Sequence, residues 1–158
     1  MDIAKSAGHR KITHDFGKVL IPYWLSKYGF ACQSIDHAGI DLIAHHPHTH
    51  ERLGLFVKAR CRNQGKEEEY VAILRHEMEN ARRACAELGC TPYVALVIDT
   101  KDIMRVFVTS LQHVLELFPC AKTRSSWQMS ERYLLEYDQD PEIYSFVFHT
   151  ETRHWWTG

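Results

Sequence analysis

The sequence lacks a long hydrophobic run, since no stretch reaches the about 18 consecutive apolar residues of a membrane-spanning helix. It also lacks an excess of either charge, because 19 Lys and Arg residues against 20 Asp and Glu residues leave a formal net charge of −1. Without a global positive field, any nucleic-acid site must be a local basic patch. With 45% hydrophobic residues, disorder is disfavoured too, so we expect a globular protein that makes no membrane contact.

Cysteine pairs with metal-binding or redox spacing are also absent. The five cysteines contain no Cys-x-x-Cys and are odd in number, which predicts reduced thiols rather than disulfides or a zinc knuckle.

Residues 1–11 carry charges and no apolar segment, so they do not resemble a secretory signal, and we expect a cytoplasmic protein. Phosphate-binding glycine loops, a nucleophile elbow and a His-Glu-x-x-His zinc motif are missing as well, which gives those enzyme classes little support.

What is present is enough chain for one core, so residues 1–158 are expected to form one domain. Apolar residues spaced by three and four predict an amphipathic helix over residues 12–28, followed by Gly29. They are Ile12, Phe16, Val19, Leu20, Tyr23, Trp24 and Tyr28. Pro22 predicts a kink in this helix or a helix start near it.

Three short alternating segments follow, at about residues 31–36, 40–45 and 53–60, and they predict a meander of strands. The polar segment between the last two (HHPHTHER) predicts a hairpin loop. In the third strand, alternation puts two sets of residues on opposite faces. One set is Leu53, Leu55, Val57 and Ala59, and the other is Gly54, Phe56, Lys58 and Arg60.

A long helix is predicted over residues 67–88 from an apolar stripe that runs from Val71 to Leu88. Acids at 67–69 would complement the dipole of its first turn, and Gly89 would cap its end. Strands at 93–98 and 103–108, helices at 111–118 and 131–137, a polar loop at 120–129 and an edge strand at 143–149 complete the prediction. The fold class is therefore α/β: a mixed sheet with flanking helices, and an α-rich C-terminal extension at about 109–158.

Two of the strand segments carry chemistry: Gly39-Ile40-Asp41-Leu42-Ile43-Ala44 and Leu55-Phe56-Val57-Lys58-Ala59-Arg60. With the elements around them, they resemble the PD-(D/E)XK nuclease superfamily, especially its Holliday-junction-resolvase-like and restriction-endonuclease-like members. The resemblance extends over about residues 12–108 and implies a core of order α-β-β-β-α-β-β. It implies Asp41 as a ligand of Mg²⁺ or Mn²⁺ if the protein is active, with no cofactor otherwise. Lys58 would be the lysine that orients the attacking water or stabilises negative charge.

The sequence departs from the family pattern at two acidic positions. Phe56 stands where the family keeps the acid of its Glu-x-Lys, and Lys18 follows Gly17 where members often have a glutamate. A site with Asp41 alone would bind Mg²⁺ poorly, because one carboxylate leaves most of the ion's charge uncompensated. Either the chemistry is weakened or lost, or a carboxylate has moved, with Asp36, Glu69 and Glu77 as the candidates. Asp41 and Lys58 could also simply pair with each other as a structural salt bridge.

Candidate contacts to nucleic acid form two groups. Arg60, Arg62 and Lys66 cluster after the third strand and suit phosphate contacts, although a solvated loop would look the same. The other group is Lys122, Arg124 and Trp127, which combine cations with an aromatic residue as single-strand binders do. DNA or RNA is therefore the expected ligand of a local basic patch.

Histidine is abundant, with eleven in the chain. Four of them, His45, His46, His48 and His50, fall in the predicted hairpin loop and could chelate a transition metal. A flexible hairpin tip would hold such an ion poorly. The excess is thus expected to be local to this loop rather than part of a catalytic core, and the closing His154-Trp155-Trp156 is expected to be a packed or dangling end.

Three functions remain open. The preferred one is a nuclease-like protein associated with nucleic acid, whose chemistry is weakened or lost. The second is an active Mg²⁺-dependent endonuclease with a relocated carboxylate. The third is a module on a nuclease scaffold that binds a protein partner or forms a homo-oligomer, because a fold does not determine a function.

Overall fold

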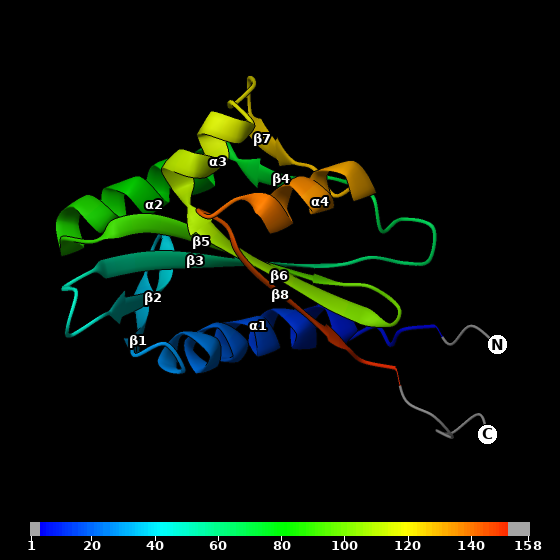
Figure 1. Ribbon diagram of the computed structural model, residues 1–158, viewed down its shortest axis with the longest axis horizontal. Coiled ribbons are helices and arrows are strands. Elements are labelled where there is room, and N and C mark those ends of the chain that lie inside the picture. Colours follow the sequence, from blue (N-terminus) through cyan, green and yellow to red (C-terminus); the bar gives the residue numbers. More distant parts are fainter. Residues whose placement is uncertain (1–3, 152–158) are drawn as a thin grey trace.

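The computed structural model describes residues 4–151, in which a six-stranded mixed sheet has helices on both faces (Figure 1). The helices are α1 (His9–Ser26), α2 (Arg75–Leu88), α3 (Leu111–Leu117) and α4 (Glu131–Gln139). The strands are β1 (Ala31–His37), β2 (Ile40–His45), β3 (Arg52–Cys61), β4 (Val71–Leu74), β5 (Thr91–Asp99), β6 (Ile103–Ser110), β7 (Arg124–Trp127) and β8 (Tyr144–His149). This confirms the predicted α/β class with a mixed sheet. Among these residues, no helix is both long and apolar enough to cross a membrane.

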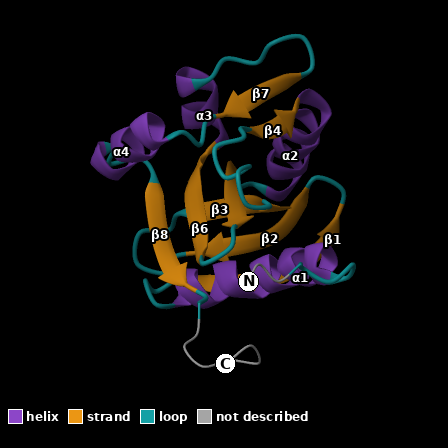
Figure 2. Cartoon of the chain, turned by 90° about the vertical axis from the view of Figure 1, so that its right-hand side faces the viewer, coloured by secondary structure: helices purple, strands orange, loops and turns teal. Residues whose placement is uncertain are grey.

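The sheet has the order β1-β2-β3-β5-β6-β8. Every neighbouring pair is antiparallel except β3 and β5, which run parallel because the chain between them crosses over through β4 and α2. The predicted meander and the hairpin loop between β2 and β3 are therefore confirmed. Strand β8 lies at the edge of the sheet, while β4 and β7 form a separate two-stranded sheet beside α2 (Figure 2).

Two hydrophobic cores lie on the two faces of the sheet. The alternation predicted for β3 is confirmed, since Leu55 and Val57 face α1 whereas Phe56 packs with α2, α3 and α4. The fully buried Trp127, from β7, also belongs to the core on the α2 side and stacks on Tyr137 with ring centroids 4.4 Å apart. Each face of β3 thus supports a different layer of helices.

The predicted first helix is present as α1, but only part of its expected stripe packs on the sheet, namely Leu20 and Trp24. Its buried residues include Gly17 and Ile21, whereas Ile12, Val19 and Tyr23 of the predicted stripe are more than 60% exposed. A Cβ on Gly17 would lie 3.2 Å from a Val57 side-chain carbon, so small residues here bring the helix close to the sheet. The predicted burial of Ile12, Val19 and Tyr23 was wrong because α1 carries apolar residues on two faces, and the face that contains Gly17 packs more closely on the sheet. Pro22 lies inside the helix, four residues before its end.

Helix α2 begins at Arg75, so the expected start at residue 67 was wrong. Val71–Leu74 forms strand β4, because its small apolar segment pairs with β7. The expected polar loop at 120–129 was wrong for the same reason, since it contains β7. Gly89 does end α2, in a left-handed conformation with φ 68°. The C-terminal part accordingly contains two strands in addition to the two predicted helices.

Candidate active site

Asp41 lies near the start of β2, just before β2 begins to pair with β3. The ladder between these strands stops at the pair Leu42 and Leu55, although β3 continues alongside β5. Beyond that pair, the Val57 amide donates a hydrogen bond to Asp41 Oδ2 at 2.6 Å. The other oxygen, Oδ1, lies 3.2 Å from Lys18 Nζ of α1. The carboxylate thus occupies the opening between two diverging strands.

Lys58 and Glu77 form an ion pair between β3 and the first turn of α2. Lys58 Nζ lies 2.5 Å from Glu77 Oε2, and the same oxygen accepts a hydrogen bond from the Leu74 amide at 3.0 Å. The Lys58 side chain is only 4% exposed. Burial lowers the pKa of Lys58 below its ordinary value, and the hydrogen bond that Lys58 donates to Glu77 opposes that shift. Since Asp41 pairs with Lys18 and Lys58 with Glu77, the alternative that Asp41 and Lys58 simply pair with each other was wrong.

Asp41, Lys58 and Glu77 line one cavity of about 280 Å³, together with Phe56. Of the three candidates for a relocated carboxylate, Glu77 is therefore the one that lines the cavity with Asp41. Of the other two, Glu69 is exposed and pairs with Lys66 at 3.3 Å, and Asp36 is exposed on β1. Neither lines the cavity.

Histidines contribute to this cavity as well, which the sequence analysis missed. His14, His37 and His76 line it, from α1, β1 and α2. The expectation that the histidine excess would stay outside a catalytic core was therefore wrong. The signal in the sequence was the high count itself, but these three residues are far apart along the chain, and only the packing of α1 and α2 on the sheet brings them together.

Cations from distant segments gather beside the site. An Arg62 side-chain nitrogen donates to the Tyr70 carbonyl at 3.0 Å, and Arg124 lies over the Tyr70 ring at 5.3 Å. Arg124 also pairs in register with Leu74, directly before α2. Arg60 is close enough for the charge of Glu77 to counteract the lowering of the Arg60 pKa by burial. We name Arg60, Arg62 and Arg124 the arginine ridge.

Three other expectations about ligands are corrected or limited by the structure. Trp127 is fully buried and has no face free to stack on a base. Lys122 is exposed on the loop before β7, whereas Lys66 pairs with Glu69. The hairpin histidines form no group of three converging donors among residues 4–151: His46 Nδ1 accepts hydrogen bonds from the backbone amides of its own loop. His154 and its neighbouring tryptophans lie outside the described residues.

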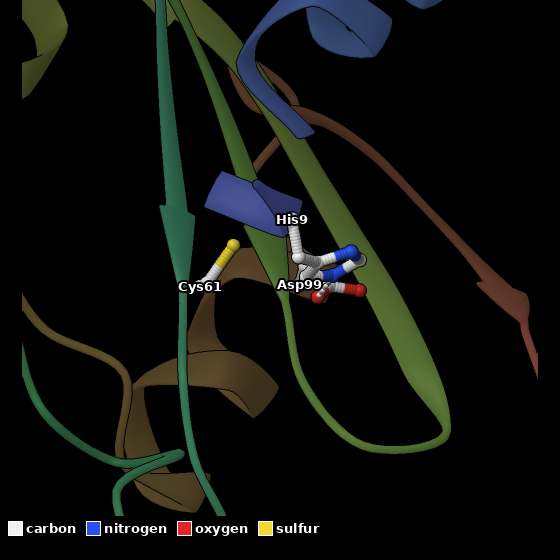
Figure 3. Close-up of side chains that lie close together, drawn as sticks. All are labelled: His9, Cys61 and Asp99. Carbon is white, nitrogen blue, oxygen red and sulfur yellow. Dashed lines mark hydrogen bonds and ion pairs between the residues drawn. The ribbon is translucent and has the colours of Figure 1, made fainter. Parts of the chain in front are cut away.

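Groups that could bind a metal do occur elsewhere. His9, Cys61 and Asp99 offer donor atoms within 4.8 Å of one another, and Figure 3 shows His9 meeting Asp99 with Cys61 at the end of β3. Asp99 is buried and already contacts both His9 Nε2 and Lys5 Nζ at 2.7 Å, so Lys5 supplies an opposite charge and His9 a further polar partner. This cluster attaches the start of α1 to the ends of β3 and β5.

The second group consists of His113, Glu116 and Glu142. His113 Nε2 also lies 2.7 Å from an oxygen of Asp140, which links α3 to the end of α4. Burial lowers the pKa of His113, but hydrogen bonds to Asp140 and Glu116 and the charge of Glu142 outweigh burial and raise it overall. A protonated His113 is therefore favoured by the acids around it.

No protein-family model and no curated protein sequence matches the chain. Solved structures do match: a Holliday junction resolvase from the archaeal hyperthermophile Archaeoglobus fulgidus superposes with a TM-score of 0.53 at 19% identity, covering 70% of this chain and 86% of the resolvase. A restriction endonuclease in complex with substrate DNA matches with a TM-score of 0.40 at 12% identity, over 94% of this chain and 74% of the other. The likeness to the resolvase shows that the chain has a restriction-endonuclease-like fold, as its sequence predicted.

Proposed function

We propose that the protein is a metal-dependent nuclease that hydrolyses phosphodiester bonds in DNA or RNA. The observation that supports this best is the position of Glu77, which lines the same cavity as Asp41 and contacts Lys58. Glu77 compensates for the acid that Phe56 replaces in the third strand. The sequence alone favoured weakened or lost chemistry, because it did not single out this second carboxylate.

The residues present suit a hard divalent cation. Asp41 and Glu77 offer carboxylate oxygens to one cavity, and none of the described residues that line it carries a sulfur atom. Mg²⁺ prefers such oxygen donors, and the histidines nearby would also tolerate Mn²⁺. When bound, such an ion lowers the pKa of a water molecule and neutralises charge on the phosphate. Asp41 and Glu77 would hold it.

The remaining groups would act on the nucleic acid itself. The Lys58 side chain is almost completely buried. Because water is largely excluded there, attraction between its ammonium group and a phosphate oxygen is stronger than in bulk water. The arginine ridge would bind phosphates on either side of the scissile bond, and such contacts position a substrate without reading its sequence. A fold shared with a Holliday junction resolvase supports DNA as the first substrate to test.

A second candidate function is phosphate binding without cleavage. It is supported by the contact of Lys18 Nζ with Asp41 Oδ1 at 3.2 Å, because this ammonium neutralises a carboxylate that a metal ion would need. Together, Lys18 and Lys58 balance the charges of Asp41 and Glu77, so the site attracts an anion more readily than a site with bare carboxylates. In this function, the protein would bind nucleic acid and leave it intact.

Cleavage of duplex, single-stranded and four-way-junction DNA with Mg²⁺ or Mn²⁺ separates the two functions. The nuclease is expected to cleave at least one of these substrates, and Asp41→Asn and Glu77→Gln to lower the rate by about 100-fold or more. Glu79→Gln, an exposed change on the same helix, is the matched control and should leave the rate unaltered.

Circular dichroism must show that the variants fold, since Glu77 also caps α2 and neutralises Lys58. Glu77→Gln keeps a hydrogen-bond acceptor for both groups. Retention of DNA without cleavage by the unaltered protein, in either metal, would contradict the nuclease and support the binding function. Cleavage that survives Asp41→Asn would show that another site is responsible.

A further inference from the structure

A second and larger cavity lies at the opposite end of the sheet. It measures about 770 Å³, within the range of roughly 300–1,000 Å³ typical of small-molecule sites. The end of α1, the β2–β3 hairpin and the first residues of β8 enclose it. Leu53 of β3 lines this cavity whereas Lys58 lines the candidate active site, and five strand residues at about 3.3 Å each separate them by roughly 17 Å. The two cavities are therefore distinct.

Aromatic rings form the walls of this cavity. Trp24 is central: its ring centroid lies 5.4 Å from that of Tyr28, 6.3 Å from Tyr144 and 5.2 Å from Phe146. Tyr93 adds a further ring from the start of β5. The interplanar angles within the set run from 30° to 61°, so the rings meet at inclined angles rather than forming one flat stack. We name these five residues the aromatic pocket.

The charges at the aromatic pocket are negative. Of the described residues that line the cavity, Glu51 and Asp138 are acidic, His46 is a histidine, and none is Lys or Arg. Burial raises the pKa of Tyr93, and the neighbouring Tyr144, Glu51 and Glu142 raise it further, so Glu51 lies close enough for its charge to act on the Tyr93 hydroxyl. A phosphate or a carboxylate ligand would be repelled here, in contrast to the arginine ridge.

Aromatic faces combined with carboxylates favour one chemical class of ligand. The face of an aromatic ring is negative and attracts a cation that carries its own apolar surface, while a carboxylate adds direct charge attraction. A small inorganic cation would use the carboxylates but leave the apolar faces of the rings without a partner, and a neutral hydrophobic compound would leave the carboxylates unused. We propose that the aromatic pocket binds an alkylammonium group, either of a free small molecule or of a lysine side chain in a peptide.

Choline and 3,3-dimethylbutan-1-ol are a matched pair of probes, because they have the same shape and only choline is charged. Titration of the ¹⁵N-labelled protein would follow the four tryptophan indole signals, with the Trp24 signal assigned through Trp24→Phe. Choline is expected to shift the Trp24 signal saturably, and the neutral alcohol to bind about tenfold more weakly or worse.

Glu51→Gln isolates the charge, because Glu51 is exposed and the change preserves its size. It should weaken choline binding several-fold and leave the neutral alcohol unaffected, while Glu79→Gln should alter neither. Equal affinity for the two probes, or no shift with choline up to about 50 mM, would overturn the proposal. A trimethyllysine peptide that binds more tightly than choline would identify a protein side chain as the source of the ammonium group, and the reverse order a free amine. Because this test needs no cleavage, its result is independent of the proposed nuclease.

Discussion

Replacing Gly39 with alanine tests how the candidate site is held in position. Gly39 forms the turn between β1 and β2, two residues before Asp41, with φ +118°. A Cβ there would lie 2.4 Å from the carbonyl oxygen of Asn80 in α2, so the methyl group would collide with helix backbone. The left-handed conformation costs about 1–2 kcal/mol for alanine, and overpacking against a rigid neighbour adds about 1–3 kcal/mol. We expect the free energy of unfolding to fall by about 3–4 kcal/mol.

Urea denaturation followed by circular dichroism measures this change, and Gly65→Ala is the matched control. Gly65 also has a positive φ, +86°, but a Cβ there would meet nothing within 4 Å, so only the conformational cost of about 1–2 kcal/mol applies. The difference between the variants therefore reports the contact between the Gly39 turn and α2. Equal destabilisation by both would refute the reasoning, because it would mean that α2 moves away freely. If the contact also positions Asp41 relative to Glu77, Gly39→Ala should lower cleavage more than Gly65→Ala does.

Three further results are expected. Lys18→Gln should raise the affinity for Mn²⁺ measured by calorimetry, because it removes the ammonium beside Asp41; unchanged affinity would mean that Asp41 does not bind the ion. Trp127→Ala should lower the free energy of unfolding by about 3–5 kcal/mol while the folded fraction still retains DNA, because the indole lies in the core. Burial lowers the pKa of His113, but its carboxylate neighbours raise that pKa overall. The stability that protonated His113 contributes is therefore complete below the ordinary pKa of 6.5 and is lost as the pH rises through the raised pKa. The urea midpoint of the unaltered protein should therefore fall as the pH rises above about 6.5, and a similar fall in His113→Gln would contradict this assignment.

The strands that carry the site could be predicted well, because a period of two assigns each residue to a face. Alternation in β3 correctly separated Lys58 from Val57, and the apolar segment of β5 correctly indicated a strand covered on both sides. Helix α1 shows where this reasoning fails. Its residues offer two apolar stripes, and hydrophobicity alone favoured the larger side chains, Ile12 and Val19. Close packing of the helix on the sheet instead requires a small residue at position 17, where the chain has glycine. This requirement depends on the shape of the sheet, which the sequence of α1 does not predict.

The start of α2 decided which acid could reach the candidate site. The physical reasoning that an acid belongs in the first turn holds, since Glu77 lies there and accepts a hydrogen bond from the Leu74 amide. The three consecutive glutamates at 67–69 also suited a first turn, and Val71 and Leu74 continue the apolar spacing of the helix. The sequence therefore favoured a helix start at residue 67. Those two residues belong to β4, whose partner β7 lies 50 residues further along the chain, and such pairing leaves no local signal. Because β4 ends at Leu74, α2 begins at Arg75, and its third residue is Glu77, which contacts Lys58. The pairing of β4 with β7 therefore determines which glutamate reaches the candidate site, and no sequence motif marks it.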